Sequence, residues 1–249
     1  MARRQVLAGF HAVTARLRVA PETIEVVYLD AQRNDARMRA LAAQLEQGGV
    51  RQVAVAAERL RGLAGTTPHQ GVVAVCVAHA PHASLDDILS AAGPDTLLLL
   101  LDGVTDPRNL GACLRSADAA GVTAVIVPRD RSATLTPDAA RAAAGAAESV
   151  ALIAVTNLAR TMDELRDAGV RMVGAAGEAD ATLFDLDLTG PLAWALGAEG
   201  SGLRRLTRER CDVLARIPLA GAVESLNVAV AAGICLFETV RQRRAAGAP

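Results

Sequence analysis

The strongest constraint on the fold is an apolar run, Thr-Leu-Leu-Leu-Leu-Leu at residues 96–101, which is followed at once by Asp102-Gly103. A strand that is apolar on both sides of its pleat must be covered on both faces, as the strands of parallel sheets are. Open sheets of this kind usually bind ligands beyond the carboxyl ends of their strands, where Asp102 stands. The run therefore predicts an α/β domain with its site just after residue 101.

Strand and helix signals alternate along the rest of the chain. The pattern predicts helices at 109–120, 137–147, 158–168 and 226–243, and strands at 123–127, 151–155, 170–175, 193–196 and 213–217. A shorter alternation before residue 78 predicts a second, smaller α/β domain, and the breaks at Pro81 and Pro94 indicate a linker. We therefore expect a domain at 1–78, a linker at 79–95 and a larger domain at 96–249.

Composition bounds the function. The 249 residues are 51% hydrophobic, yet no apolar run has membrane-spanning length and the N-terminus lacks a signal-type apolar block. We expect a soluble cytoplasmic protein without a membrane partner. The four cysteines form no Cys-x-x-Cys pair, which favours small core residues in a reducing compartment. His79 and His82 flank Pro81 and are better explained as linker residues than as ligands, so no metal is expected.

Every one of the 26 basic residues is an arginine. The absence of lysine excludes P-loop nucleotide hydrolysis and Schiff-base chemistry, because both need a lysine amine. The net charge of −1 is unevenly divided: residues 1–80 hold 10 arginines against 6 acidic residues, and residues 81–249 hold 16 against 21. A basic N-terminal part is typical of an RNA-docking module attached to a catalytic module, although ordinary surface variation gives differences of this size too.

Three glycine-bearing segments hold the candidate chemistry. They are Asp102-Gly-Val-Thr-Asp-Pro-Arg-Asn-Leu-Gly-Ala-Cys-Leu-Arg115, Ala195-Leu-Gly-Ala-Glu-Gly-Ser-Gly-Leu203, and Ile217-Pro-Leu-Ala-Gly-Ala-Val-Glu-Ser-Leu-Asn-Val-Ala-Val-Ala-Ala-Gly233. Simpler explanations exist for single residues: Asn109 or Ser225 can cap a helix, and Arg115 can pair with Asp118. The dinucleotide fingerprint is missing, because its glycine spacing is reversed at 197–202.

In order and spacing, the three segments together resemble the motifs of the SpoU (TrmH) family of RNA 2′-O-ribose methyltransferases. The resemblance covers essentially the whole chain. It implies S-adenosylmethionine as cofactor, a C-terminal SPOUT domain whose parallel sheet carries a deep trefoil knot, and a homodimer whose sites draw on both subunits. It also implies that the N-terminal domain is an RNA-binding domain of the L30e/L7Ae type, in which His69 and Gln70 either contact RNA or only shape their loop.

The resemblance assigns roles to individual residues. The main chain of Gly197, Ile217 and Leu226 matches the positions that surround the cofactor. The catalytic positions it assigns are Asn109, Arg115, Glu199, Ser225 and Asn227. An arginine, with a pKa above ~12, is a poor base, so we expect Arg115 to hold an RNA phosphate and to stabilise the developing alkoxide. We further expect Gly111, one turn earlier, to let the phosphate approach. Ala229 departs from the pattern, since the family often has serine there.

Within the family, the chain looks most like the enzymes that methylate a guanosine ribose in the peptidyl-transferase P-loop of 23S rRNA. We therefore expect 23S rRNA as the substrate. Two alternatives stay open: a methyltransferase acting on a guanosine ribose of tRNA, and a ribosome-assembly factor that binds RNA without catalysis.

Overall fold

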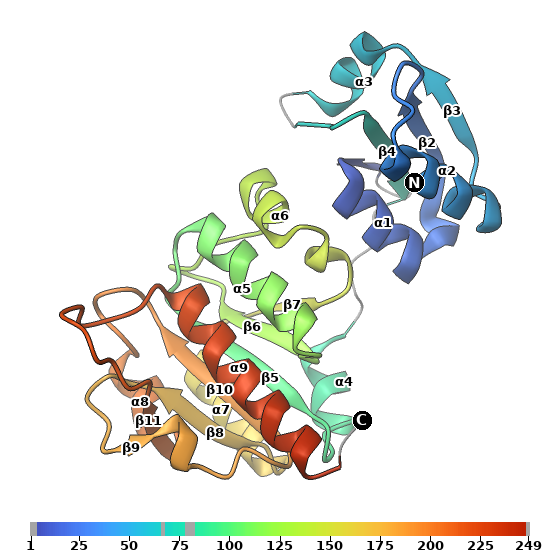
Figure 1. The fold of residues 1–249 in the computed structure, drawn as a ribbon. Coiled ribbons are helices and arrows are strands. Elements are labelled where there is room, and N and C mark those ends of the chain that lie inside the picture. Colours follow the sequence, from blue (N-terminus) through green and yellow to red (C-terminus); the bar gives the residue numbers. More distant parts are fainter. Residues whose placement is uncertain (1–3, 66–67, 78–82, 248–249) are drawn as a thin grey trace. The chain divides into compact units, whose positions relative to one another are not determined.

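The computed structural model describes residues 4–65, 68–77 and 83–247 (Figure 1), so His79 and His82 lie outside the described residues. The chain forms two compact units. Unit 1 comprises residues 1–81 together with 144–149, and unit 2 comprises 82–143 and 150–249. Among the described residues, no helix is long and apolar enough to cross a membrane.

Unit 1 is a four-stranded sheet with the order β1-β4-β2-β3. Its strands are β1 (Arg4–Ala8), β2 (Ile24–Asp30), β3 (Gln52–Val55) and β4 (Val72–Val77), and its helices are α1 (Phe10–Val19), α2 (Ala36–Gln47) and α3 (Ala57–Ala64). Strand β4 runs antiparallel to β1 and β2, whereas β3 is parallel to β2. The core lies between the sheet and the apolar faces of α1 and α2, and it includes Phe10, Val13 and Leu45.

Residues 144–149 belong to unit 1, although they follow helix α6 (Pro137–Ala143) of unit 2. The helix expected at 137–147 ends at residue 143 because Ala144 and Gly145 have positive φ angles of 51° and 101°. A side chain at position 145 would lie 2.8 Å from the carbonyl oxygen of His11, so glycine is required there. The segment is fixed by Arg16, whose buried guanidinium donates hydrogen bonds to Glu148.

Unit 2 is built on a seven-stranded sheet with the order β7-β6-β5-β10-β8-β11-β9. The strands are β5 (Leu97–Asp102), β6 (Ala124–Pro128), β7 (Ala151–Val155), β8 (Arg171–Ala175), β9 (Ala181–Thr182), β10 (Leu192–Gly197) and β11 (Val213–Arg216). Every pairing is parallel, and all six residues of β5 are buried. The parallel α/β sheet predicted from the apolar run is therefore confirmed.

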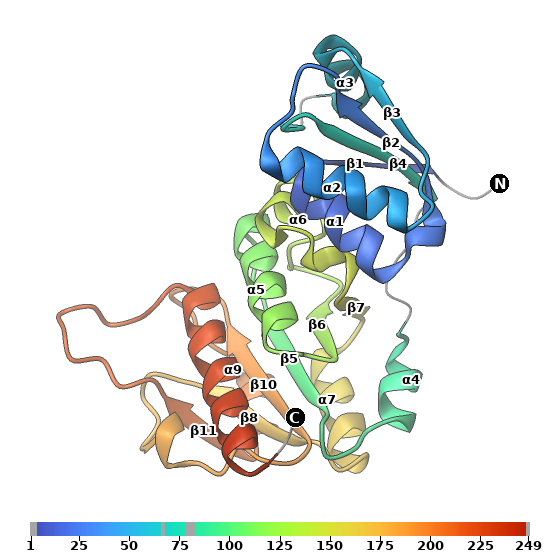
Figure 2. The same ribbon diagram turned by 45° about the vertical axis from the view of Figure 1, so that its right-hand side comes forward.

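Helices cover both faces of this sheet (Figures 1 and 2). Helices α5 (Pro107–Ala119) and α9 (Val228–Ala245) pack against each other, and α9 also contacts β10. Helices α4 (Leu85–Ser90) and α7 (Leu158–Asp167) pack on the other face, against the core of Leu98, Ile126 and Met162. The indole nitrogen of Trp194 donates to the hydroxyl of Thr239 over 2.9 Å, which ties β10 to α9 inside the core.

Capping residues decide where the two site helices begin. Helix α5 starts before the expected residue 109 because Asp106 accepts from the main-chain nitrogen of Arg108 and Pro107 takes the first helical position. Helix α9 starts after the expected residue 226 because Asn227 caps it. A short helix, α8 (Arg205–Glu209), was not predicted from the sequence. The trefoil knot stays a prediction, because strand order alone does not establish how the chain threads.

Candidate active site

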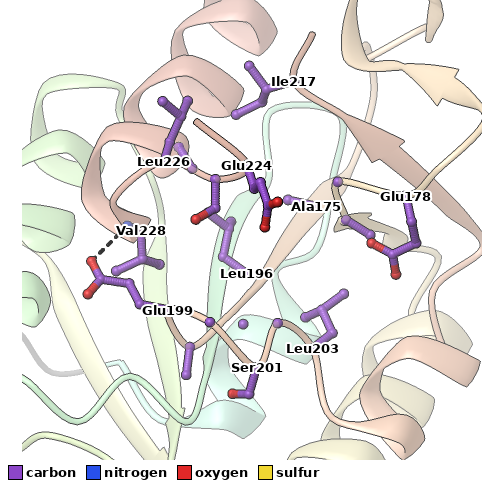
Figure 3. Close-up of a pocket in the computed structure, with 18 of the residues that line it drawn as sticks. Ala175, Glu178, Leu196, Glu199, Ser201, Leu203, Ile217, Glu224, Leu226 and Val228 are labelled. Carbon is purple, nitrogen blue, oxygen red and sulfur yellow. Dashed lines mark hydrogen bonds between the residues drawn. The ribbon is translucent and has the colours of Figure 1, made fainter. Parts of the chain in front are cut away.

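A cavity of about 490 Å³ lies where β8, β10 and β11 of unit 2 end (Figure 3). Its walls come from the loops after these strands and from the first turn of α9. Gly197, Ile217 and Leu226, the three residues predicted to surround the cofactor, all line it. Its volume is in the range of pockets for small ligands, and its position at the carboxyl ends of parallel strands agrees with the usual site of such folds.

The glycine-rich loop folds back on the end of β10. A side chain at Gly197 would lie 1.9 Å from the carbonyl carbon of Gly202 and 2.2 Å from the nitrogen of Leu203. The main-chain nitrogen of Gly202 donates to Ala198 over 2.9 Å, and Gly202 itself has a φ of 64°. Position 197 therefore needs glycine because the loop's own backbone occupies the space of a Cβ.

Asp102 and Arg204 hold the far end of this loop against β5. The carboxylate of Asp102 is 1% exposed and accepts from the main-chain nitrogen of Arg204 over 2.9 Å. The guanidinium of Arg204 also lies 3.3 Å from the other carboxylate oxygen. Asp102 was expected at the site from its place after a buried strand, whereas Arg204 was not predicted. An acidic residue that ends a fully buried strand was the available signal, because a buried charge needs a partner.

Three of the five proposed catalytic residues form one hydrogen-bonded network. Glu199 Oε1 accepts from Asn109 Nδ2 over 3.2 Å, from Asn227 Nδ2 over 2.5 Å and from the main-chain nitrogen of Val228 over 3.4 Å. Asn227 Nδ2 also donates to Asn109 Oδ1 over 3.0 Å. The network joins the start of α5, the glycine-rich loop and the start of α9 beside the cavity.

The observed N-caps of α5 and α9 test the simpler explanation that Asn109 and Ser225 only cap these helices. Asn109 does not cap α5, because Asp106 does. Asn227 does cap α9, because its Oδ1 accepts from the main-chain nitrogens of Ala229 and Val230. Its side-chain oxygen thus caps the helix while its side-chain nitrogen joins the network. The expectation that Ser225 caps this helix was wrong: Ser225 is exposed and lines the cavity two residues before the cap.

Arg115 stands apart from the network. It is exposed on α5, does not line the cavity, and follows Asn109 by six residues, which corresponds to about 9 Å along a helix axis. No ion pair of its side chain is found among the described residues. The expected role of Gly111 in phosphate approach was wrong, because a side chain there would lie 2.2 Å from the Ala139 carbonyl oxygen of α6.

Charged residues at the cavity were missed by the sequence analysis. Glu178 and Arg208 both line it and form an ion pair with each other, and Glu224 lines it from the loop before α9. Figure 3 shows Glu178 and Glu224 extending into the opening, whereas the carboxylate of Glu199 turns toward Val228. Glu178 follows the end of β8 by three residues, and this position at a strand end was the available signal.

The cysteines supply no nucleophile to the site. Burial raises the thiol pKa to about 11 for Cys76 and to about 12 for Cys113, Cys211 and Cys235. Nearby Glu199 adds to the shift at Cys113, because a negative charge disfavours the thiolate. Within the described ranges, no group of three or more His, Cys, Asp or Glu side chains is arranged to hold a metal ion.

Comparison with known proteins places these features in a family. The model of the SpoU rRNA Methylase family matches residues 96–237, and a model described as RNA 2′-O ribose methyltransferase substrate binding matches residues 6–82. The 23S rRNA (guanosine-2′-O-)-methyltransferase RlmB of Bordetella pertussis is 55% identical over 244 residues, which cover 98% of this chain and all of that protein.

A second relative and a solved structure agree. RlmB of Ralstonia nicotianae is 55% identical over 243 residues, covering 98% of both proteins. The SpoU methyltransferase AviRb from Streptomyces viridochromogenes, solved in complex with AdoMet, superposes with a TM-score of 0.75 at 30% identity, covering 97% of this chain and 91% of that one. The chain therefore belongs to the SpoU rRNA methylase family.

Proposed function

We propose that this chain transfers the methyl group of S-adenosylmethionine to the 2′-hydroxyl of a guanosine ribose in 23S rRNA, in the peptidyl-transferase P-loop. The observation that carries the proposal is the Glu199 network, which stands beside the cavity in a chain that is 55% identical to RlmB enzymes over nearly its full length. Alignment over 98% of the chain includes the N-terminal part, which favours an rRNA substrate over the tRNA alternative.

The cavity fits S-adenosylmethionine in size and in charge. When bound, this cofactor supplies an electrophilic methyl group on a positively charged sulfonium. The charged lining side chains are Glu178, Glu199 and Glu224 against the single Arg208. Their summed negative charge favours a ligand whose sulfonium and ammonium groups outweigh its one carboxylate. The apolar lining by Leu196, Ile217 and Leu226 provides a slot for the adenine ring.

In this proposal the chain's main task is to position the reactants. Glu199 fixes the ends of three segments, so that Asn109 and Asn227 hold a set geometry beside the methyl donor. The exposed hydroxyl of Ser225 is available to orient the acceptor sugar. Arg115 anchors an RNA phosphate and stabilises the negative charge that develops on the 2′-oxygen. As this oxygen bonds to the methyl carbon, the bond from that carbon to sulfur breaks and the hydroxyl proton passes to water.

We also propose a homodimer, because Arg115 does not reach the cavity within one chain. Helix α9 leaves an apolar stripe uncovered within unit 2: Val230 is 51% and Phe237 48% exposed, with the half-buried Ile234 between them. The buried face of α9 is a different one and includes Ala232 and Cys235. A second copy that covers the stripe would bring its own Arg115 to the partner's cavity, since α5 packs beside α9.

Subunit mixing tests the dimer. Arg115→Ala and Glu199→Ala subunits are each inactive under the proposal. If a site takes Arg115 from one subunit and Glu199 from the other, a mixed dimer has one site without defects and one with both. Mixing equal amounts should then restore about a quarter of the wild-type rate, as expected for random pairing in a twofold dimer. No recovery in verified mixed dimers would contradict the shared site.

The activity itself is tested with purified protein, labelled cofactor and unmodified 23S rRNA or tRNA transcripts. We expect label only in the rRNA, at one guanosine ribose of the P-loop, and about 10²–10³-fold slower labelling with the Arg115→Ala variant. Label in tRNA alone would establish the tRNA alternative. Calorimetry that detects RNA binding but no cofactor binding would establish the non-catalytic one. Because the proposed substrate is ribosomal RNA, we place the protein in the cytoplasm.

A further inference from the structure

In unit 1, two arginines lie against the ring of one phenylalanine, and a histidine lies beside one of them. We name this group the Phe10 cluster; its members are Phe10 and His11 at the start of α1, Arg33 in the loop before α2, and Arg37 in the first turn of α2. The guanidinium carbons of Arg33 and Arg37 lie 4.8 Å and 4.5 Å from the centre of the Phe10 ring. A ring nitrogen of His11 lies 3.1 Å from Arg37 Nη2.

The surrounding contacts hold these groups in place. Arg33 pairs with Asp35 and donates to the carbonyl oxygen of Gln70, which ties the cluster to the loop before β4. His69 Nδ1 accepts a hydrogen bond from the main-chain nitrogen of Gly71 over 3.0 Å, so this residue shapes the loop. Arrangement around a buried ring limits the rotamers of both arginines before any ligand arrives, which lowers the entropic cost of binding.

Arg37 is the exposed arginine of the cluster, and its charge is not neutralised by a described ion pair. Asp35 serves Arg33, whereas Arg37 has no ion-pair partner among the residues that the structure describes. The groups that contact it are instead the Phe10 ring and the imidazole of His11. An anion that approaches Arg37 therefore has no carboxylate partner to displace. The first turn of α1 adds main-chain N–H groups, because its cap residue Gly9 has no side chain to accept from them.

We propose that the Phe10 cluster binds the phosphate backbone of the substrate RNA, with Arg37 as the principal contact. Phosphate rather than base is indicated because Phe10 is only 2% exposed and its ring is covered by the arginines, so no base can stack on it. The inference rests on the proposed function for its substrate. It adds to that function the place in unit 1 where the RNA docks.

The dependence of RNA affinity on salt tests the proposal. The full chain and its Arg37→Gln, Arg37→Lys and Arg59→Gln variants would be titrated with a 23S rRNA P-loop transcript at several salt concentrations. Each lost phosphate contact reduces the slope of log affinity against log salt by about 0.7 to 0.9. We expect this reduction for Arg37→Gln alone, because lysine keeps the charge and Arg59 is an exposed arginine on α3, outside the cluster.

Cofactor affinity and the melting temperature of Arg37→Gln should stay at wild-type values, which separates loss of a contact from loss of structure. An unchanged slope for Arg37→Gln, or an equal reduction for Arg59→Gln, overturns the phosphate site. The two proposals fail independently. A wild-type protein that methylates no guanosine ribose refutes the proposed function, whereas the salt slope still decides the Phe10 cluster.

Discussion

Helix α5 carries two candidate catalytic residues in opposite situations. At its start, Asn109 both donates and accepts within a network that also contains Glu199 and Asn227. Six residues later, Arg115 is exposed and has no ion-pair partner in the described parts of the chain. The polar groups of the first site satisfy one another, so folding alone completes it. The guanidinium of Arg115 is free to bind an anionic group of a ligand or of a partner subunit.

This contrast separates the two halves of the proposed reaction. The network stands beside the cavity and belongs to the cofactor half, which one chain builds by itself. Arg115 belongs to the RNA half, which we propose is completed by a second copy. Substitutions at the network should therefore change folding and cofactor binding, whereas substitutions at Arg115 should change RNA binding and turnover but neither folding nor cofactor binding.

The largest effect is expected from Gly197→Ala, which should displace the loop that carries Glu199 and so disrupt the network. The new methyl group meets backbone atoms of Gly202 at about 2 Å, so the loop that carries Glu199 must move. Overpacking of this kind costs about 1–3 kcal/mol, and we expect cofactor affinity by calorimetry to fall at least about tenfold. Gly221→Ala is the control, because nothing lies within 4 Å of its Cβ position. Equal losses in both variants would refute the explanation.

Arg115→Ala tests the other residue of the comparison, which we expect to matter for the reaction and not for folding. We expect the methyl-transfer rate to fall by about 10²–10³, as for removal of one charge-stabilising donor. Cofactor affinity and melting temperature should not change, since the side chain is exposed and supports no described contact. Arg160→Ala, an exposed arginine that pairs with Glu164 on α7, is the matched control and should keep full activity. A lower melting temperature for Arg115→Ala would show a structural role instead.

Glu199→Ala and Glu199→Gln measure how much the network contributes to folding. Glu199 Oε1 accepts three hydrogen bonds, so alanine leaves three donors without their acceptor. Because Glu199 is exposed and water can replace it, we expect a loss of about 1 kcal/mol in the free energy of unfolding. Glutamine keeps an acceptor oxygen and should lose less. Denaturant titration gives both values, and equal losses would mean that charge matters more than geometry.

The smallest effect concerns the cap that starts α5. The hydrogen bond from the main-chain nitrogen of Arg108 holds the pKa of Asp106 below its ordinary value. A lowered pKa in the folded state stabilises the fold above the unfolded-state pKa, and this contribution is lost as the pH falls through the folded-state pKa. Unfolding of wild type and Asp106→Asn between pH 2 and pH 6, a range of about two units around the ~3.9 of free aspartate, tests it. Asparagine still caps but does not titrate, so its acid loss should be slightly smaller.

The local elements of this protein were predictable because their causes are local. The apolar run that forms β5 predicts burial on both faces, and all of this strand is buried. Strand β7 begins and ends at its predicted residues, 151 and 155. Helix ends were less accurate. Asp106, Asn227 and the pair Ala144-Gly145 decide them through caps and positive φ angles, and the competing cap candidates at 109 and 225 look equally good in the sequence.

The sequence by itself determined the α/β class, the parallel sheet and the three segments that carry the site, because apolar periodicity and glycine spacing are written along the chain. Only the tertiary structure decided which polar groups meet. Asn109 and Glu199 are 90 residues apart, and they touch because β5 and β10 are neighbours in the sheet. Likewise, residues 144–149 joined unit 1 through the buried contact between Arg16 and Glu148. Such pairings depend on strand order and long-range packing, which no local pattern encodes.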